Sequence, residues 1–164
     1  MKIRLQKSQP TDDEYLMIGI STSMPDYQLS FHLNKQFHTS FKKFPDIPLY
    51  NKTGLIGHFA FYYFHEEDLR VDYYLFGNKN QHKIAVKDYK HFEFFILFKL
   101  SSFLIPIQDI LKEVRQIPQI VAALQIPLEK FKILEDLLED IELHLLECNS
   151  RTQKDAMQWL WTGR

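Results

Sequence analysis

The sequence has little cysteine, little glycine and no excess of charge. Its single cysteine, Cys148, excludes an internal disulfide. Its five glycines stand singly, which excludes the glycine-rich phosphate loops of Rossmann and P-loop nucleotide sites. The formal net charge is −1, so the composition shows no overall preference for nucleic acid or for an anionic membrane.

The sequence also lacks a long uninterrupted apolar run. The longest such stretch, residues 94–107, is interrupted by Lys99, two serines and Pro106. It falls short of the roughly 18 apolar residues that a membrane-spanning helix needs. The first 14 residues are polar and hold no apolar segment of the signal-peptide kind. We therefore expect a soluble, cytoplasmic protein.

Hydrophobic and aromatic residues are abundant, at 45% and 15% of the chain. This composition is typical of a folded domain rather than a disordered chain. A chain of 164 residues fits one domain and buries about two thirds of the surface that its unfolded form exposes. We expect a single domain over residues 1–148, followed by a tail at 149–164 that is either disordered or docked through its tryptophans.

The most distinctive stretch is an aromatic hairpin. Residues 57–64 and 70–76 are rich in aromatic and β-branched residues, and the charged segment 65–69 separates them. This pattern predicts two paired strands with a solvated connection. A Gly-Asn turn at Gly77 ends the second strand.

The rest of the chain alternates strand and helix signals. Ser23 and Asp26 form an S-x-x-D capping box with Pro25 in the first turn, which predicts a helix from there to Phe37. Further strands are expected at 15–20, 41–51, 91–98 and 119–126, and further helices at 106–116 and 127–148. The predicted fold class is α+β, a mainly antiparallel sheet with its helices on one face, in the order β-α-β-β-β-β-α-β-α.

Parts of residues 14–132 resemble the IPExxxVDY family of small bacterial proteins. The resemblance rests on the segments Met17–Ile20, Asp26–Leu29, Leu33–Lys35, Tyr74–Lys79, Ile117–Pro118 and Leu128–Lys130. By spacing, the naming motif of the family falls here on Val86, Asp88, Phe92, Glu93 and Phe94, with its proline and its tyrosine replaced. The resemblance implies a cytoplasmic bacterial protein and supplies no catalytic chemistry, since the family has no established activity.

No local motif carries catalytic or metal-binding chemistry. The seven histidines form no His-x3-His or Glu-x2-His spacing, and the lone cysteine forms no Cys-x2-Cys pair. We therefore expect no metal and no cofactor, and we identify no catalytic residue. The sequence favours a protein that is not an enzyme, while an active site assembled only in three dimensions stays open.

The helix expected at 127–148 is the leading functional candidate. Its apolar residues recur at the spacing of a coiled-coil seam and are Phe131, Leu134, Leu138, Ile141 and Leu145. Two interpretations are open: the seam binds a protein partner or a second copy of the chain, or it covers the sheet. Under the first interpretation the protein is an interaction or self-association module, for example a homodimer.

The alternative function is binding of single-stranded nucleic acid. Aromatic residues on a sheet, flanked by the five lysines at 79–99, are typical of such platforms. Solvent exposure of Tyr62, Tyr74 and Phe95 would favour this hypothesis. A pocket that joins histidine and carboxylate side chains would favour an enzyme instead.

Overall fold

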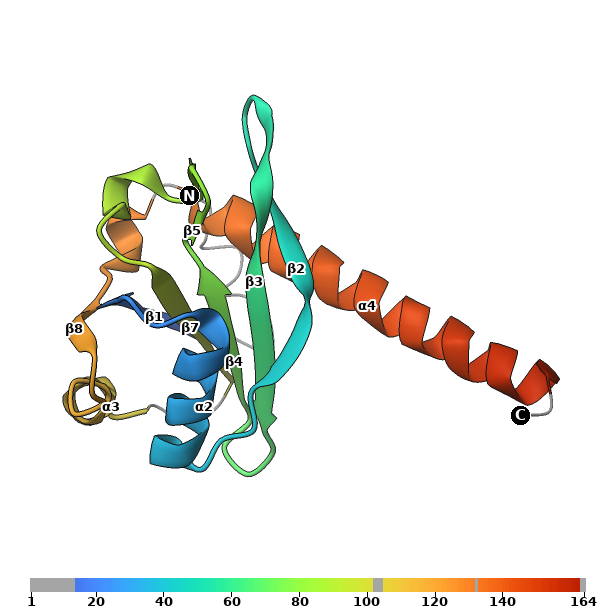
Figure 1. Cartoon of the computed structure of the whole chain (residues 1–164), viewed down its shortest axis with the longest axis horizontal. Helices are drawn as coiled ribbons and strands as arrows, with labels where there is room; N and C mark the ends of the chain where they lie inside the picture. The colour runs from blue at the N-terminus through green and yellow to red at the C-terminus, as the bar shows by residue number, and fades with distance from the viewer. Residues whose placement is uncertain (1–13, 102–104, 132, 163–164) are drawn as a thin grey trace.

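The computed structural model describes residues 14–101, 105–131 and 133–162, with side chains for all of these except 130 and 152–162. Its centre is an antiparallel six-stranded sheet in the order β2-β3-β4-β7-β1-β8 (Figure 1). The elements in chain order are β1 (Glu14–Thr22), α2 (Asp26–Phe37), β2 (Lys42–Asn51), β3 (Gly54–Glu66), β4 (Val71–Gly77), β5 (Lys79–Asn80), β6 (Lys83–Ile84), the 3₁₀ turn η1 (Lys87–Tyr89), β7 (Phe94–Leu100), α3 (Ile107–Val114), β8 (Ile120–Gln125), the 3₁₀ turn η2 (Leu128–Lys130) and α4 (Leu134–Thr162).

The predicted class and element order are confirmed. The aromatic hairpin is β3 and β4, paired antiparallel from Phe61–Phe76 to Glu66–Val71. The segment between two prolines, read as a strand, is β8 and pairs with β1. β5 and β6 form a separate two-stranded ribbon in the connection between β4 and β7.

The helices cover both faces of the sheet rather than one. α2 and α3 pack on one face through buried residues such as Leu29 and Val114, and α4 packs on the other through Leu137 and Ile141. The reason lies in β7, where Phe94, Ile96 and Phe98 face α2 and α3 while the residues between them face α4. A strand that is apolar on both sides has to be covered on both sides.

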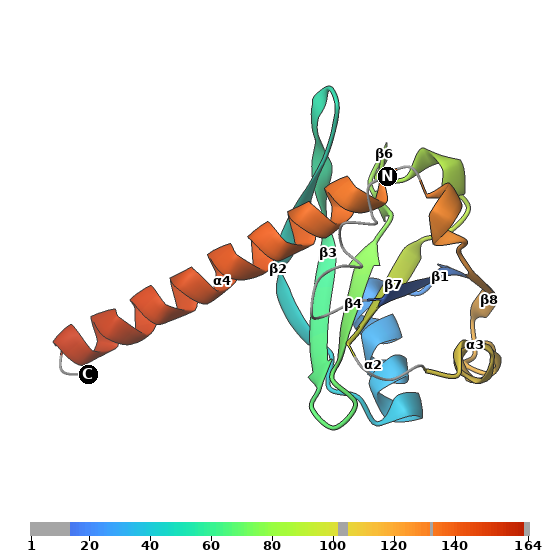
Figure 2. The ribbon, with the colours of Figure 1, turned by 180° about the vertical axis from the view of Figure 1, so that it is seen from behind.

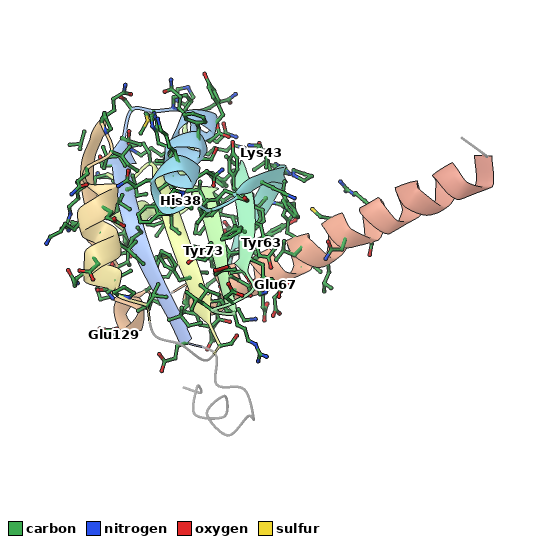
Figure 3. The ribbon with its side chains drawn as sticks, turned by 90° about the horizontal axis from the view of Figure 1, so that it is seen from below. His38, Lys43, Tyr63, Glu67, Tyr73 and Glu129 are labelled. Atoms are coloured by element: carbon green, nitrogen blue, oxygen red, sulfur yellow. The ribbon has the colours of Figure 1, made fainter. Side chains whose placement is uncertain are left out.

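The two faces hold two separate hydrophobic clusters. Tyr73 belongs to the side of α2 and α3, where its ring meets those of Phe41 and Phe98 edge-on at 6.0 and 5.3 Å. Tyr63 belongs to the side of α4 and stacks on Tyr74 at 5.5 Å. Both labelled tyrosines are seen from below in Figure 3, between α2 and the start of α4.

The first helix begins later than the capping box predicts. Pro25 is the N-cap residue of α2, in extended conformation, and no side chain caps the helix there. Ser23 therefore does not act as the cap. Thr22 instead fixes the segment before the helix, because its Oγ1 accepts a hydrogen bond from the Met24 amide at 3.1 Å.

The last helix also begins later than expected. Pro127 opens only the short turn η2, and Phe131 then turns extended, with φ −90° and ψ 94°. Phe131 is buried and its ring stacks on Tyr89 at 5.9 Å. Burial of this ring holds the backbone out of the helical conformation, so α4 starts at Leu134.

Residues 149–162, expected as a tail, continue α4 as helix. α4 is 29 residues long and runs well past the sheet, so that its second half stands away from the body of the molecule (Figures 1 and 2). The docking of Trp159 and Trp161 falls on side chains outside the described part.

Candidate functional site

The predicted seam of α4 faces its own sheet. Phe131 and Ile141 are buried in the cluster on this face, at 5% and 2% exposure. Leu134, Leu138 and Leu145 pack against the same cluster. Two of the five candidate interaction residues are therefore buried and three are partly buried against the sheet. Of the two interpretations of the seam, the structure supports the one in which it covers the sheet.

Two polar contacts anchor α4 to the edge strand β2. The buried His144 places Nε2 at 2.8 Å from the carbonyl oxygen of Pro45, which makes this nitrogen a donor, and its ring meets Phe61 edge-on at 5.3 Å. One carboxylate oxygen of Asp140 accepts the amide hydrogen of Tyr50 at 3.1 Å. Because β2 is the outermost strand, these bonds hold α4 across the edge of the sheet.

Cys148 marks the point where the packed part of α4 ends. It is the last residue of the helix that is buried among those with described side chains. Its Sγ lies 3.7 Å from Nε2 of His144. Burial raises the pKa of the Cys148 thiol, an effect that exceeds the opposing influence of Arg151. The thiol is therefore not primed as a thiolate nucleophile.

The outer face of α4 presents exposed leucines and a strong charge. Leu143 is 56% exposed and Leu146 is 65% exposed, one turn apart on the side away from the sheet. Between Leu134 and Cys148 the helix carries six carboxylates and no lysine or arginine. The sequence pattern did not indicate these two leucines, because they alternate with the residues of the inner seam, which has the longer apolar repeat.

The positions equivalent to the family motif build the connection from β4 to β7. The side chain of Asn78 is fully buried at the centre of this connection. Its Nδ2 donates to the carbonyl oxygens of Tyr89 and Phe92 at 2.9 and 3.0 Å, and its Oδ1 accepts the amide hydrogen of Val86 at 2.7 Å. Asp88 lies exposed in η1.

The second half of the motif joins this connection to β1. Glu93 accepts the Thr22 amide hydrogen through Oε1 at 2.9 Å and pairs with Lys79 through Oε2 at 2.7 Å. Phe92 is buried directly over Gly19, where an added Cβ would lie 2.6 Å from its ring. Phe94 is buried on the opposite side of the sheet, in the cluster with α2 and α3. These contacts give the motif positions a structural role.

One histidine–carboxylate pair lies at the far end of the hairpin. Asp72 Oδ1 accepts hydrogen bonds from Tyr63 Oη at 2.6 Å and from His65 Nδ1 at 2.7 Å. Burial, followed by the bond to Asp72, raises the pKa of Tyr63. The phenol is thus held protonated as a donor, and the pair sits on the partly exposed sheet surface rather than in any described pocket.

Three cavities among the described residues contain few charged groups. One of about 290 Å³ lies between η1 and the start of α4, with Lys87 and Asp88 as its charged residues. Another of about 210 Å³ lies between α2 and α3 and is almost wholly apolar, lined by Phe37, Phe98 and Ile110 among others. The third, of about 460 Å³, lies between β1 and residues 125–129, with Glu129 as its charged residue. None of the three gathers the convergent polar groups that orient a substrate.

The rings required for nucleic-acid stacking are buried. Tyr62 and Tyr74 are each 5% exposed, and Phe95 is inaccessible. Bases cannot stack on rings that α2, α4 and the neighbouring strands already cover. These three rings therefore offer no surface for stacking, and the exposure that would favour the nucleic-acid hypothesis is not found at them.

Among the described residues, no three His, Cys, Asp or Glu side chains come together as metal ligands. None of the described helices is both long and apolar enough to span a membrane. A scan against protein-family models finds no match, and a search of curated proteins finds no significant relative. The resemblance to the IPExxxVDY family stays a prediction.

Proposed function

We propose that the protein is a non-enzymatic interaction module that self-associates through the outer face and the projecting half of α4. The single observation that carries this proposal is that α4 runs for 29 residues, whereas Cys148 is the last buried residue among its described side chains and the second half of the helix stands away from the sheet (Figures 1 and 2). Covering the sheet accounts for the first half of the helix and leaves the second half unexplained.

The length of the projecting part of α4 also supports the proposal. At a rise of 1.5 Å per residue, residues 149–162 extend α4 by about 21 Å beyond the packed part. These residues continue a helix that is already formed, but most helical stability in proteins comes from tertiary packing of an apolar face. A helix of this length therefore gains from a second surface to pack against, and the exposed Leu143 and Leu146 lead directly into it.

The open edge of β8 is the competing surface. Val121 is 82% exposed and Leu124 is 49% exposed on this edge strand. Unpaired strand edges can pair with another chain. β8 is only six residues long and lies between Pro118 and Pro127, which limits the ladder that it can offer. We therefore favour α4 as the association surface.

Sedimentation over a concentration series separates the two surfaces. We expect the mass of the full chain to rise above the monomer value of 19.7 kDa as its concentration increases. The double variant Leu143→Glu/Leu146→Glu should stay at the monomer mass, because charged side chains do not pack in a helix seam. Val121→Glu is the matched control and should associate like the parent.

The opposite pattern would transfer the function to the strand edge. If Val121→Glu is monomeric while Leu143→Glu/Leu146→Glu still associates, β8 is the association surface and the proposal for α4 fails. Thermal unfolding of each variant establishes that it is folded, since all three positions are exposed and surface substitutions change stability little.

A further inference from the structure

A second heptad pattern runs along the outer face of α4. It starts at the exposed Leu143 and Leu146. The same alternation of three and four residues continues in the sequence at Ser150, Gln153, Met157 and Leu160. This register is distinct from the inner seam, and it spans the packed and the projecting parts of the helix.

We propose that the partner of α4 is a second copy of the chain, and that the two helices pair antiparallel about a two-fold axis near residues 151 and 152. This inference rests on the proposed function and names its partner. In this register the position of Leu143 lies opposite that of Leu160 in the second copy, and Leu146 lies opposite Met157. Each apolar position of one half therefore meets an apolar position of the other half.

The order of polar and apolar positions is self-complementary. Between the two apolar pairs, Ser150 stands opposite Gln153 of the second copy, so the polar positions also meet each other. A two-fold interface requires the same patch to fit itself, because each contact occurs twice. The pattern reads alike from both ends, as such an interface requires.

The charges favour the antiparallel arrangement over the parallel one. The first half of α4 holds six carboxylates without lysine or arginine, whereas residues 149–162 hold Arg151 and Lys154 against the single acid Asp155. Antiparallel pairing places Glu142 and Glu147 alongside the projecting half of the second copy, with Glu147 flanking its Lys154. The other four carboxylates then lie beyond the last residue of that helix, Thr162. Parallel pairing would place six carboxylates against six, which is unfavourable.

The position of the two-fold axis also leaves room for both domains. The proposed axis lies just beyond Cys148, where α4 has left the sheet (Figures 1 and 2). The two domains would then lie towards opposite ends of the helix pair. Association of this kind closes at two copies, since a two-fold contact leaves no further matching surface.

Disulfide trapping with two single-cysteine chains tests this register. Both chains are full length and carry Cys148→Ala; one also carries Ser150→Cys and the other Gln153→Cys. The chains are mixed in equal amounts and oxidised with glutathione disulfide, which is reduced to glutathione, and intact mass spectrometry counts the three possible cross-linked dimers. Thr53→Cys in the same background is the control for random collision, because Thr53 is exposed in the β2–β3 turn.

The antiparallel register predicts an excess of the mixed dimer. Positions 150 and 153 lie level across the axis, whereas identical positions are offset by about 4.5 Å along the helices, which adds to the separation between helices and exceeds disulfide reach. We expect the mixed dimer to exceed either symmetric dimer by about tenfold, against about twofold for unbiased pairing. The Thr53→Cys chain should cross-link far more slowly.

Each other outcome overturns the inference in a different way. Dominant symmetric dimers would show a parallel pair. Cross-linking no faster than that of the Thr53→Cys control, in a chain that still associates in sedimentation, would remove this register and leave association through α4 in place. A full chain that stays monomeric in sedimentation would remove the proposed function together with the inference.

Discussion

Asn78 binds three residues of the β4–β7 connection, Val86, Tyr89 and Phe92, through one buried side-chain amide. The sequence identifies Asn78 only as a turn residue after Gly77, because the groups that it binds come from residues 8 to 14 positions later. A local pattern cannot predict partners that the fold brings back from such a distance. Its importance is visible only once the whole connection is in place.

Replacing Asn78 tests this role. Asn78→Ala should lower the free energy of unfolding by about 2–4 kcal/mol, because it removes the side-chain bonds to the buried Val86 amide and to the carbonyl oxygens of Tyr89 and Phe92. Asn80→Ala, which removes an exposed bond to the His58 carbonyl, should cost less than about 1 kcal/mol. Urea denaturation of both variants measures the difference, and equal losses would contradict this role.

Asp26 gives a residue-scale prediction about pH. Burial alone raises the pKa of Asp26, but hydrogen bonds from Lys43 at 2.9 Å and Tyr62 at 2.8 Å outweigh burial and lower the pKa below the ordinary value of 3.8. Since the folded carboxyl group has the lower pKa, the ionised group stabilises the fold above about pH 4, and this contribution is lost as the pH falls through the folded pKa.

The variant Asp26→Asn should therefore be less stable than the parent at about pH 7, and the gap should narrow towards about pH 3. Urea denaturation at both pH values measures this difference in the free energy of unfolding. Asp46→Asn is the control, because its carboxylate is 47% exposed and lies 3.4 Å from the same lysine. If the difference in stability between Asp26→Asn and the parent stays constant with pH, the ionised carboxylate of Asp26 is not what stabilises the fold there.

At the scale of elements, strand and helix periods predict what forms, and burial decides where each element begins. β8 is predictable because it is short, apolar and bounded by prolines. The start of α4 is not, since burial of the Phe131 ring overrides a proline that is otherwise typical of a helix start. The sheet also needs cover on both faces, a demand that becomes visible only when β7 lies in the middle of it.

The two faces of α4 give a prediction at the same scale. Ile141→Ala should lower the free energy of unfolding by about 2–4 kcal/mol, because Ile141 is 2% exposed within the cluster under the helix. Leu143→Ala, two residues later and 56% exposed, should change it by less than about 0.5 kcal/mol. Thermal or urea unfolding distinguishes them, and a large loss for Leu143→Ala would place that residue in the core.

The candidate site shows the limit of pattern reading along a single helix. The inner seam and the outer register both satisfy heptad spacing, and the sequence alone does not tell which of them faces the sheet. The structure decides this through Ile141, His144 and Cys148, which are buried, and through Leu143 and Leu146, which are not. The function predicted for α4 survives as a proposal only by moving to the other face.

At the scale of the whole molecule, the division of charge along α4 matters more than the net charge of the chain. Glu147→Lys and Lys154→Glu should each weaken self-association, because each places like charges together in the proposed pair. The double variant should recover it, since the exchange restores opposite charges. Sedimentation of the three variants checks this prediction, and failure of the double variant to recover association would contradict the antiparallel register.

The most direct test of the account is the solution mass by light scattering of the full chain and of a chain that ends at Asn149. The account predicts a concentration-dependent dimer, with a mass approaching twice 19.7 kDa, for the full chain. The shortened chain should be a folded monomer with a cooperative thermal transition, because it keeps the buried residues Leu137, Ile141 and Cys148. A full chain that stays monomeric would contradict self-association, and a shortened chain that still dimerises would contradict the claim that the projecting half of α4 is needed for it.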